Sequence, residues 1–272
     1  MSNKTMLITG ASSGIGQATA KHFQSQGWNV IATMRKPEDG AELAKLTNVA
    51  VVRLDVTDFE SIGAAVAEGK ERFGGIDVLL NNAGYGAYGP LENFALDRIQ
   101  RQFDTNVIGL LAVTKAVLPL MRERKSGLIV NISSMGGQVT FPLGTLYHGT
   151  KFAVEGISEA LHYELAAIGV RMKIIEPGMI ATDFSGRSLD FANDPPIDAY
   201  QDIVNALMKS RSGDAFKTSP PELVAEVIWE AVNDGTDRLR YQAGADAEQM
   251  VAGRKAADDA TFIAGIKKMI GL

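Results

Sequence analysis

Short runs rich in Val and Ile alternate with longer amphipathic patterns along most of the chain. Many of these runs are apolar at successive positions, as expected of strands that helices cover on both faces. The alternation predicts right-handed crossovers and an α/β fold with a doubly wound parallel sheet of about seven strands. Strands are expected at 5–9, 29–34, 49–54, 76–81, 128–132, 170–176 and 238–242, and helices at 14–26, 58–73, 97–124 and 147–168.

The stretch 178–221 breaks this rhythm. It contains Pro195-Pro196, several Gly and Ser residues, and scattered aromatics. A connection of that length is unusual unless it has a function of its own, so we expect a substrate loop or lid there. Residues 1–272 contain no linker or internal repeat, which predicts a single domain.

Composition excludes several classes of function. The net charge of −5 and the absence of a basic run argue against a nucleic-acid partner. The chain has no Cys, which excludes disulfides and thiolate metal sites and suits a reducing cytoplasm. The apolar stretch 107–121 is interrupted by polar residues and Pro119, which favours a buried helix and no membrane partner. No zinc site is expected, because the three His residues (His22, His148, His162) are scattered.

A glycine-rich turn, Thr9 to Gly16, follows the first expected strand directly. Glycines at a strand-to-helix turn let the backbone approach a pyrophosphate, and the helix N-terminus offers free N–H groups. The turn could instead be only a tight structural turn, but its place in a βαβ unit favours a dinucleotide. The candidate cofactor contacts in this turn are Gly10, Ser12, Ser13, Gly14, Ile15 and Gly16.

Cations follow the second strand, where the adenosine ribose is expected. An acidic residue there would bind the 2′-hydroxyl of NAD, but no carboxylate occurs before Glu38. Arg35 has a planar fork that suits a 2′-phosphate, and Lys36 adds charge. The alternative is two solvated surface cations. We expect NADP as cofactor, with NADPH preferred over NADH.

Further polar residues end the next two strands, at the sheet edge where open α/β folds bind ligands. These candidate cofactor contacts are Asp55, Val56, Asn82, Ala83 and Gly84. Taken alone, Asp55 could be an ordinary loop carboxylate and Asn81 could only hold its own turn.

Tyr147 and Lys151 lie four residues apart in an expected helix, and therefore on one face. A tyrosine with a pKa of ~10 is a poor acid or base at neutral pH, but a nearby cation lowers the pKa of an acid. Lys151 and an oxidised nicotinamide ring could together bring Tyr147 toward neutrality. The pair could also arise by chance. Ser133 and Ser134 end the fifth strand, where a serine can donate to a substrate oxygen or form a turn.

In order and spacing, these motifs resemble the short-chain dehydrogenase/reductases of the short, single-domain type. The resemblance rests on T-G-A-S-S-G-I-G, Asp55, N-N-A-G, Asn106, N-I-S-S, Y-x-x-x-K and Pro177-Gly178, and it covers Thr5 to about Tyr241. It implies a Rossmann-type fold with helices on both faces of the sheet. It also implies an oxidoreductase that transfers a hydride between NADP(H) and a ketone or secondary alcohol.

The resemblance implies a catalytic tetrad of Asn106, Ser134, Tyr147 and Lys151. The tyrosine exchanges the substrate proton, the serine orients the substrate, the lysine binds the nicotinamide ribose, and the asparagine holds a water. Ser134 is chosen over Ser133 because the family's serine lies thirteen residues before its tyrosine. Pro177, Gly178 and Thr182 match further cofactor contacts.

A narrower resemblance is to a 17-beta-hydroxysteroid-dehydrogenase-like branch. A hydrophobic substrate is expected from the apolar candidates near the ligand edge. These are Tyr85, Tyr88, Phe141, Leu143, Met179 and Phe184, any of which could instead belong to the core. The family implies a homodimer or homotetramer that assembles through the helices at 97–124 and 147–168. Alternatives are an NADP-binding regulatory protein without catalysis and, less favoured, an epimerase or dehydratase.

Overall fold

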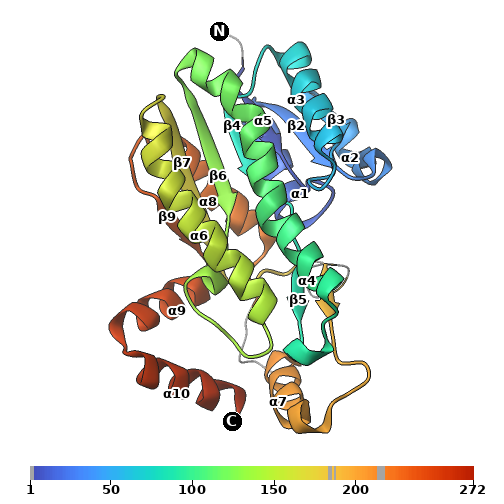
Figure 1. The fold of residues 1–272 in the computed structure, drawn as a ribbon. Helices are drawn as coiled ribbons and strands as arrows, with labels where there is room; N and C mark the ends of the chain where they lie inside the picture. Colours follow the sequence, from blue (N-terminus) through green and yellow to red (C-terminus); the bar gives the residue numbers. More distant parts are fainter. Residues whose placement is uncertain (1–2, 183–185, 187, 213–217) are drawn as a thin grey trace.

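The computed structural model describes residues 3–182, 186, 188–212 and 218–272. Its centre is a seven-stranded sheet in the order β3-β2-β1-β4-β6-β7-β9, in which every neighbouring pair is parallel (Figure 1). The expected doubly wound sheet is therefore confirmed. The strands are β1 (Thr5–Ile8), β2 (Asn29–Met34), β3 (Val49–Arg53), β4 (Val78–Asn81), β6 (Gly127–Ile132), β7 (Val170–Pro177) and β9 (Arg240–Ala243).

Helices cover both faces of this sheet. On one face lie α1 (Gly14–Ser25) and α8 (Pro221–Asn233); on the other lie α3 (Phe59–Phe73), α5 (Gly109–Arg124) and α6 (Thr145–Ala166). Successive residues of a strand point to opposite faces, so Ile8 packs with the first group and Leu7 with the second. The remaining helices are α2 (Ala41–Ala44), α4 (Leu96–Phe103), α7 (Gln201–Ser212), α9 (Ala245–Ala256) and α10 (Asp259–Ile270).

Two segments differ from the sequence-based expectation. The helix expected at 97–124 is α4 and α5 joined by a π-helical turn, Asp104–Ile108, which no hydrophobic period reveals. The stretch 178–221 is not one long loop, because it carries β8 (Leu189–Phe191) and α7. Strand β8 pairs in parallel with the unexpected short strand β5 (Gly86–Tyr88). Below the sheet in Figure 1, α7 lies against α10, so this helix of the stretch packs onto the C-terminal helix.

The ligand edge follows from the strand order. β1 lies between β2 and β4, so the chain crosses from one half of the sheet to the other at this point. In open α/β sheets a crevice forms at such a switch, outside the carboxyl ends of the strands. The glycine-rich turn after β1 and the Asn82 segment after β4 both begin there.

One continuous helical stretch, Leu96–Arg124, is long and apolar enough to cross a membrane by length and composition. An 18-residue segment within it has a mean hydropathy of 1.4, and 39% of that segment is buried. Val113, Val117 and Met121 of this stretch pack into the core against the sheet. A core helix passes the same test, and the expected absence of a membrane partner stays a prediction.

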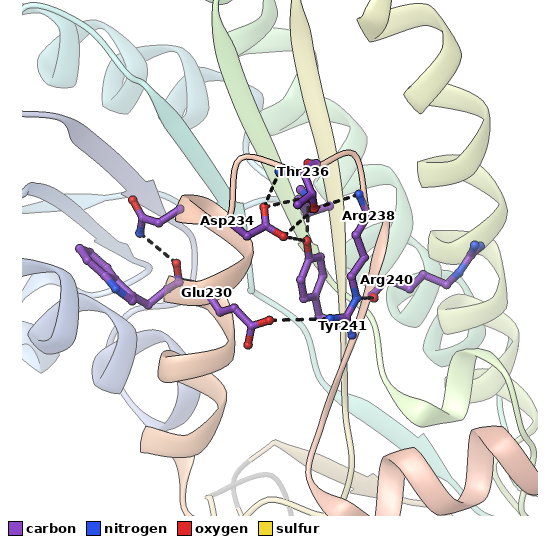
Figure 2. A network of polar contacts seen from close by, with 9 residues as sticks. Glu230, Asp234, Thr236, Arg238, Arg240 and Tyr241 are labelled. Carbon is purple, nitrogen blue, oxygen red and sulfur yellow. Dashed lines mark hydrogen bonds and ion pairs between the residues drawn. The ribbon is translucent and has the colours of Figure 1, made fainter.

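A polar network braces the amino end of β9, away from the ligand edge (Figure 2). The Lys173 ammonium is buried and donates to the Tyr241 hydroxyl and the Thr236 carbonyl, both at 2.7 Å, while Asp234 Oδ1 lies 3.4 Å away. Burial by itself would raise the pKa of Asp234. Hydrogen bonds from Tyr241 and Thr236 outweigh it and hold this pKa well below its ordinary value.

Replacing this carboxylate gives a test of the network. Asp234→Asn should lower the free energy of unfolding at neutral pH by about 2 kcal/mol, because charge-assisted hydrogen bonds are lost. The folded-state pKa is depressed, so the stabilisation is present above the unfolded-state pKa and is lost as pH falls. The difference from wild type should therefore shrink below pH ~4. Denaturant titrations measure it, with the exposed Asp237→Asn as control; equal effects of both variants would contradict the assignment.

Candidate active site

A cavity of about 1100 Å³ opens at the carboxyl edge of the sheet. It is large enough for a dinucleotide and a small substrate together. Residues that line it come from the ends of β1, β2, β3, β4, β6 and β7, from the start of α6, and from β8 and α7. Among the expected site residues they include Gly10, Ser12, Ser13, Gly14, Ile15, Arg35, Lys36, Asp55, Val56, Asn82, Ala83, Gly84, Ser134, Tyr147, Lys151, Pro177, Gly178 and Thr182.

The glycine-rich turn is held open by its backbone conformation. Gly10 and Gly14 have φ angles of +68° and +53°, which side-chain-bearing residues rarely adopt. Asn82 reaches across from β4, and its Nδ2 donates to the carbonyls of Thr9 at 2.9 Å and Gly10 at 3.0 Å. The turn is therefore fixed from the neighbouring strand.

Gly16 does not line the cavity, and its expected cofactor contact stays a prediction. A Cβ at this position would lie 2.4 Å from the Gly10 carbonyl oxygen and 2.7 Å from Asn82 Nδ2. The residue is a glycine because α1 packs directly against the turn. Its role is to bring the helix N-terminus close to the cavity.

The far end of the cavity carries the expected cations. Arg35 and Lys36 are exposed and line it, but so does Asp39, a carboxylate that the sequence did not single out. Asp55 lines the cavity while its Oδ1 accepts from the Thr57 N–H at 3.0 Å and the Thr57 hydroxyl at 2.8 Å. Asp55 thus holds its own turn as well as facing the site.

Tyr147 and Lys151 lie in the first two turns of α6, with Lys151 Nζ 5.8 Å from the centre of the Tyr147 ring. Lys151 Nζ donates to the Ile132 carbonyl at 2.9 Å, which ties it to the end of β6. The helix therefore presents both side chains to the cavity, as their spacing predicts.

Burial dominates the electrostatics of this pair, and the expected joint effect of Lys151 and an oxidised nicotinamide on Tyr147 stays a prediction. Burial raises the pKa of Tyr147 to about 12, with a hydrogen bond to Ser134 opposing the rise. Burial also lowers the pKa of Lys151 to about 8, opposed by the Glu155 carboxylate. The low polarity of the buried surroundings disfavours both the tyrosinate of Tyr147 and the ammonium of Lys151. The protein's own groups therefore leave the tyrosine protonated and do not bring its pKa toward neutrality.

The two serines after β6 face different surroundings. Ser134 lines the cavity, and its Oγ accepts from the Gly136 N–H at 3.0 Å. Ser133 turns its Oγ toward Gly137, where a Cβ would lie 2.6 Å from it and 2.9 Å from Glu155 Cγ. Ser133 also lines the cavity, but Ser134 is the serine that forms a hydrogen bond with Tyr147.

Asn106 lies in the π-helical turn and is buried, but it does not line the cavity. Its Oδ1 accepts from the Tyr85 N–H at 3.1 Å, and its Nδ2 donates to the Tyr85 carbonyl at 2.9 Å and the Thr150 hydroxyl at 3.1 Å. The side chain thus joins the Tyr85 segment to α6 as a positioning residue. The water-holding role expected from the family stays a prediction.

At the substrate end, four of the six expected apolar residues line the cavity. Tyr85, Tyr88, Phe141 and Met179 line the cavity. Leu143 does not: its carbonyl binds the Gly89 N–H at 2.8 Å, and its φ of +63° belongs to the turn before α6. Phe184 lies outside the described residues. Lining residues that the sequence did not reveal include His148, Arg101, Asp190, Leu189 and Leu207.

Arg101 and Asp190 show why the sequence did not reveal these additional lining residues. Asp190 of β8 accepts from Arg98 at 2.5 Å and from Arg101 at 3.0 Å, and Arg101 also donates to the Tyr85 hydroxyl at 3.3 Å. The partners are about ninety residues apart in sequence, so no local pattern signals the contact.

A charged cluster, in which Glu155 and Glu176 are buried and Glu159 is exposed, lies behind Lys151. Arg240 of β9 lies 2.9 Å from Glu155, 2.6 Å from Glu159 and 3.6 Å from Glu176. Burial, with the nearby Glu155 carboxylate adding to it, raises the pKa of Glu176 to about 7. The cluster anchors α6 to β7 and β9, one helical turn after Lys151.

The family is decided by comparison with known proteins. A model of short-chain dehydrogenases matches residues 4–192. The chain belongs to the short-chain dehydrogenase family. As such it is an oxidoreductase with a nucleotide-binding fold, and the narrower branch expected from the sequence stays a prediction.

Individual relatives agree with this assignment. An uncharacterized oxidoreductase of Schizosaccharomyces pombe is 45% identical over 242 residues, which cover 88% of this chain and 100% of the relative. The crystal structure of a short-chain dehydrogenase from Streptomyces avermitilis is 35% identical, covers 99% of this chain and 98% of its own, and has a TM-score of 0.85.

Solved neighbours contain both forms of the cofactor. Actinorhodin polyketide ketoreductase with NADPH is 29% identical, with a TM-score of 0.76 and coverage of 90% of this chain and 98% of its own. A dehydrogenase/reductase from Burkholderia phymatum in complex with NAD shares the fold at 24% identity, with a TM-score of 0.78 and coverage of 93% and 92%.

The residues present fit a nicotinamide dinucleotide. The glycine turn leaves the N-terminus of α1 open to a pyrophosphate, and Thr182 lies against this turn, since a Cβ on Gly14 would be 3.1 Å from its Cγ2. Within the described residues, no group of three or more His, Asp or Glu is placed to hold a metal ion.

Two glycine substitutions in helices test the role of Gly16. Gly16→Ala should lower the free energy of unfolding by about 1–3 kcal/mol, because the methyl overlaps backbone of the turn. It should also weaken NADPH binding. Gly63→Ala in α3, where nothing lies within 4 Å of the added Cβ, should instead stabilise by up to about 1 kcal/mol. Denaturant unfolding and NADPH titration measure both effects; a neutral Gly16→Ala would contradict the steric argument.

Proposed function

We propose that this protein catalyses hydride transfer between NADP(H) and a ketone or secondary alcohol, with Tyr147 as general acid and base. One observation carries the proposal. Ser134, Tyr147 and Lys151 converge in a single cavity whose other end is the glycine-rich turn. A group that exchanges protons thus lies in the same enclosed space as a dinucleotide cradle.

Each of these side chains has a role in the proposed reaction. Tyr147 donates its Oη proton to the carbonyl oxygen in reduction and accepts it from the alcohol in oxidation. Ser134 orients that oxygen by hydrogen bonding, and Lys151, held by the Ile132 carbonyl, binds the cofactor ribose. The bound nicotinamide supplies the hydride and, when oxidised, a positive charge that favours tyrosinate. Burial of Tyr147 excludes water from the proton transfer.

The preference for NADP rests on Arg35 and Lys36 at the adenosine end. Asp39 at the same end is the residue that would favour NAD instead, so the balance of charge decides the cofactor. The preference for a hydrophobic substrate rests on Tyr85, Tyr88, Phe141 and Met179.

Residues 178–221 are proposed to cover the substrate. Strand β8 and Leu207 of α7 line the cavity, and Asp190 ties β8 to Arg98 and Arg101 of α4. Assembly into a homodimer or homotetramer through α4–α5 and α6 is also proposed. Support comes from large apolar side chains that the turn between α4 and α5 and helix α6 expose, Ile108 and Phe152.

Removing the Tyr147 hydroxyl tests the mechanism. Tyr147→Phe should lower kcat by roughly 10²–10⁴-fold, because the proton donor is lost, while NADPH affinity stays near wild type. The assay follows NADPH absorbance with acetophenone, cyclohexanone and methyl pyruvate. Tyr163→Phe is the matched control, since Tyr163 lies on the same helix and is 72% exposed. Undiminished turnover in Tyr147→Phe would contradict the proposal.

The rival is an NADP-binding regulatory protein without catalysis. Tight NADPH binding together with no turnover across a wide panel of ketones and alcohols would favour it. The presence of Ser134, Tyr147 and Lys151 in one cavity argues for the enzyme.

Reversing the charge at Arg35 tests the cofactor. Arg35→Asp should lower the ratio of kcat/KM for NADPH to that for NADH by about 10- to 100-fold, the worth of a charge-assisted hydrogen bond. Arg122→Asp makes the same exchange on the exposed end of α5 and should leave the ratio unchanged. A wild-type preference for NADH would show that Asp39 outweighs the two cations.

A further inference from the structure

His148 follows Tyr147 on α6, and its imidazole is only 4% exposed. Both ring nitrogens bind the main chain of the segment after β6. The Phe141 N–H donates to Nε2 at 3.0 Å, and Nδ1 lies 2.9 Å from the Gly136 carbonyl oxygen. A carbonyl oxygen only accepts and an amide N–H only donates. The ring must therefore be neutral with its proton on Nδ1.

The backbone of Gly136 connects this imidazole to Ser134. Its carbonyl accepts from His148 Nδ1, while its own N–H donates to Ser134 Oγ at 3.0 Å. His148 thus holds Gly136 at its carbonyl, and the N–H of Gly136 in turn holds the Ser134 hydroxyl. Burial, opposed by the bond to the Gly136 carbonyl, lowers the pKa of His148, in agreement with a neutral ring.

The surrounding chain leaves room for this ring. A Cβ on Gly136 would lie 2.9 Å from His148 Nδ1, and a Cβ on Gly144 would lie 2.4 Å from its Cδ2. No side chain larger than hydrogen fits at either position with the imidazole in place. The buried His148 ring therefore explains why both Gly136 and Gly144 are glycines.

The second ring nitrogen, Nε2, holds a segment of the cavity wall at the expected substrate end. The segment that Nε2 holds carries Phe141, which lines the cavity, and the two rings lie 6.0 Å apart. The imidazole also packs against Tyr147 at 5.7 Å and Tyr88 at 6.0 Å. His148 therefore contacts Phe141 and Tyr88 of the cavity wall as well as Tyr147.

We propose that His148 is a positioning residue for the reaction, with a separate task for each ring nitrogen. Nδ1 orients Ser134 through the backbone N–H and carbonyl of Gly136, and Nε2 holds the Phe141 segment of the cavity wall against which the substrate lies. The inference rests on the proposed function, because it presupposes that Ser134 orients the substrate oxygen.

Two amide substitutions separate the two tasks. In His148→Asn, the side-chain amide can take the place of Nδ1 and donate to the Gly136 carbonyl, but it is too short to reach the Phe141 N–H. In His148→Gln, the amide oxygen can take the place of Nε2 and accept from Phe141, while the donor to Gly136 is lost. His148→Leu removes both contacts.

The expected result is a split between kcat and KM. His148→Gln should lower kcat by about tenfold or more, because small misplacements of a reacting group are costly. His148→Asn should mainly raise KM for the ketone, because the apolar wall is loosened while Ser134 stays held. The matched controls are His162→Asn and His162→Gln on the same helix, which should leave both constants unchanged. NADPH affinity should stay near wild type in all variants.

Crystal structures of the two variants add a readout that needs no substrate. In His148→Gln, Ser134 Oγ should leave the Gly136 N–H; in His148→Asn, that bond should remain while the Phe141 segment shifts. If both folded variants keep wild-type kcat and KM, or if both structures are unchanged, the inference is overturned. The Tyr147→Phe variant distinguishes failure of the proposed function from failure of the inference about His148. Full turnover in Tyr147→Phe contradicts the proposed function. An inactive Tyr147→Phe together with His148 variants of wild-type kcat and KM contradicts only the inference about His148.

Discussion

The seven strands of the central sheet all run in one direction, and the site depends on this constraint. Because the strands are parallel, every strand has its carboxyl end at the same edge of the sheet, and each connection between neighbours crosses back over the sheet. The glycine turn, the Asn82 segment, Ser134 and Gly178 follow β1, β4, β6 and β7 at that edge. Residues more than 160 positions apart therefore line one cavity.

Polar side chains that bind the backbone hold these loops in place. Asn82 fixes the turn after β1, Asn106 fixes the Tyr85 segment, and His148 fixes the segment after Ser134. Each is at least partly shielded from water, where a hydrogen bond is stronger and an unsatisfied group is costly. The loops at the ligand edge are thus positioned by neighbours, in agreement with the need for a preorganised site.

The same shielding sets the protonation states. Tyr147 and Lys151 are both disfavoured as ions, so the chain alone keeps a neutral phenol and a lysine that loses its proton more easily than usual. The Arg240 cluster behind them keeps Glu155 and Glu176 inside the fold, and Glu155 works against the loss of the lysine proton. Charge on Tyr147 therefore depends on what binds in front of it, which is where a positively charged nicotinamide would lie.

The sequence by itself determined the features that local patterns encode. Strand runs, helical periods, the glycine turn and the four-residue spacing of Tyr147 and Lys151 reflect short-range geometry, and the structure has them where expected. Only the tertiary structure decided that Gly16 serves helix packing, that Leu143 lies outside the cavity, that Asn106 holds Tyr85, and that His148 and Asp190 belong to the site. Burial also raises the pKa of Tyr147 in the chain by itself, which the spacing of Tyr147 and Lys151 does not reveal. These features depend on contacts between distant segments, and a linear pattern carries no information about which side chains will share one enclosed, water-poor space.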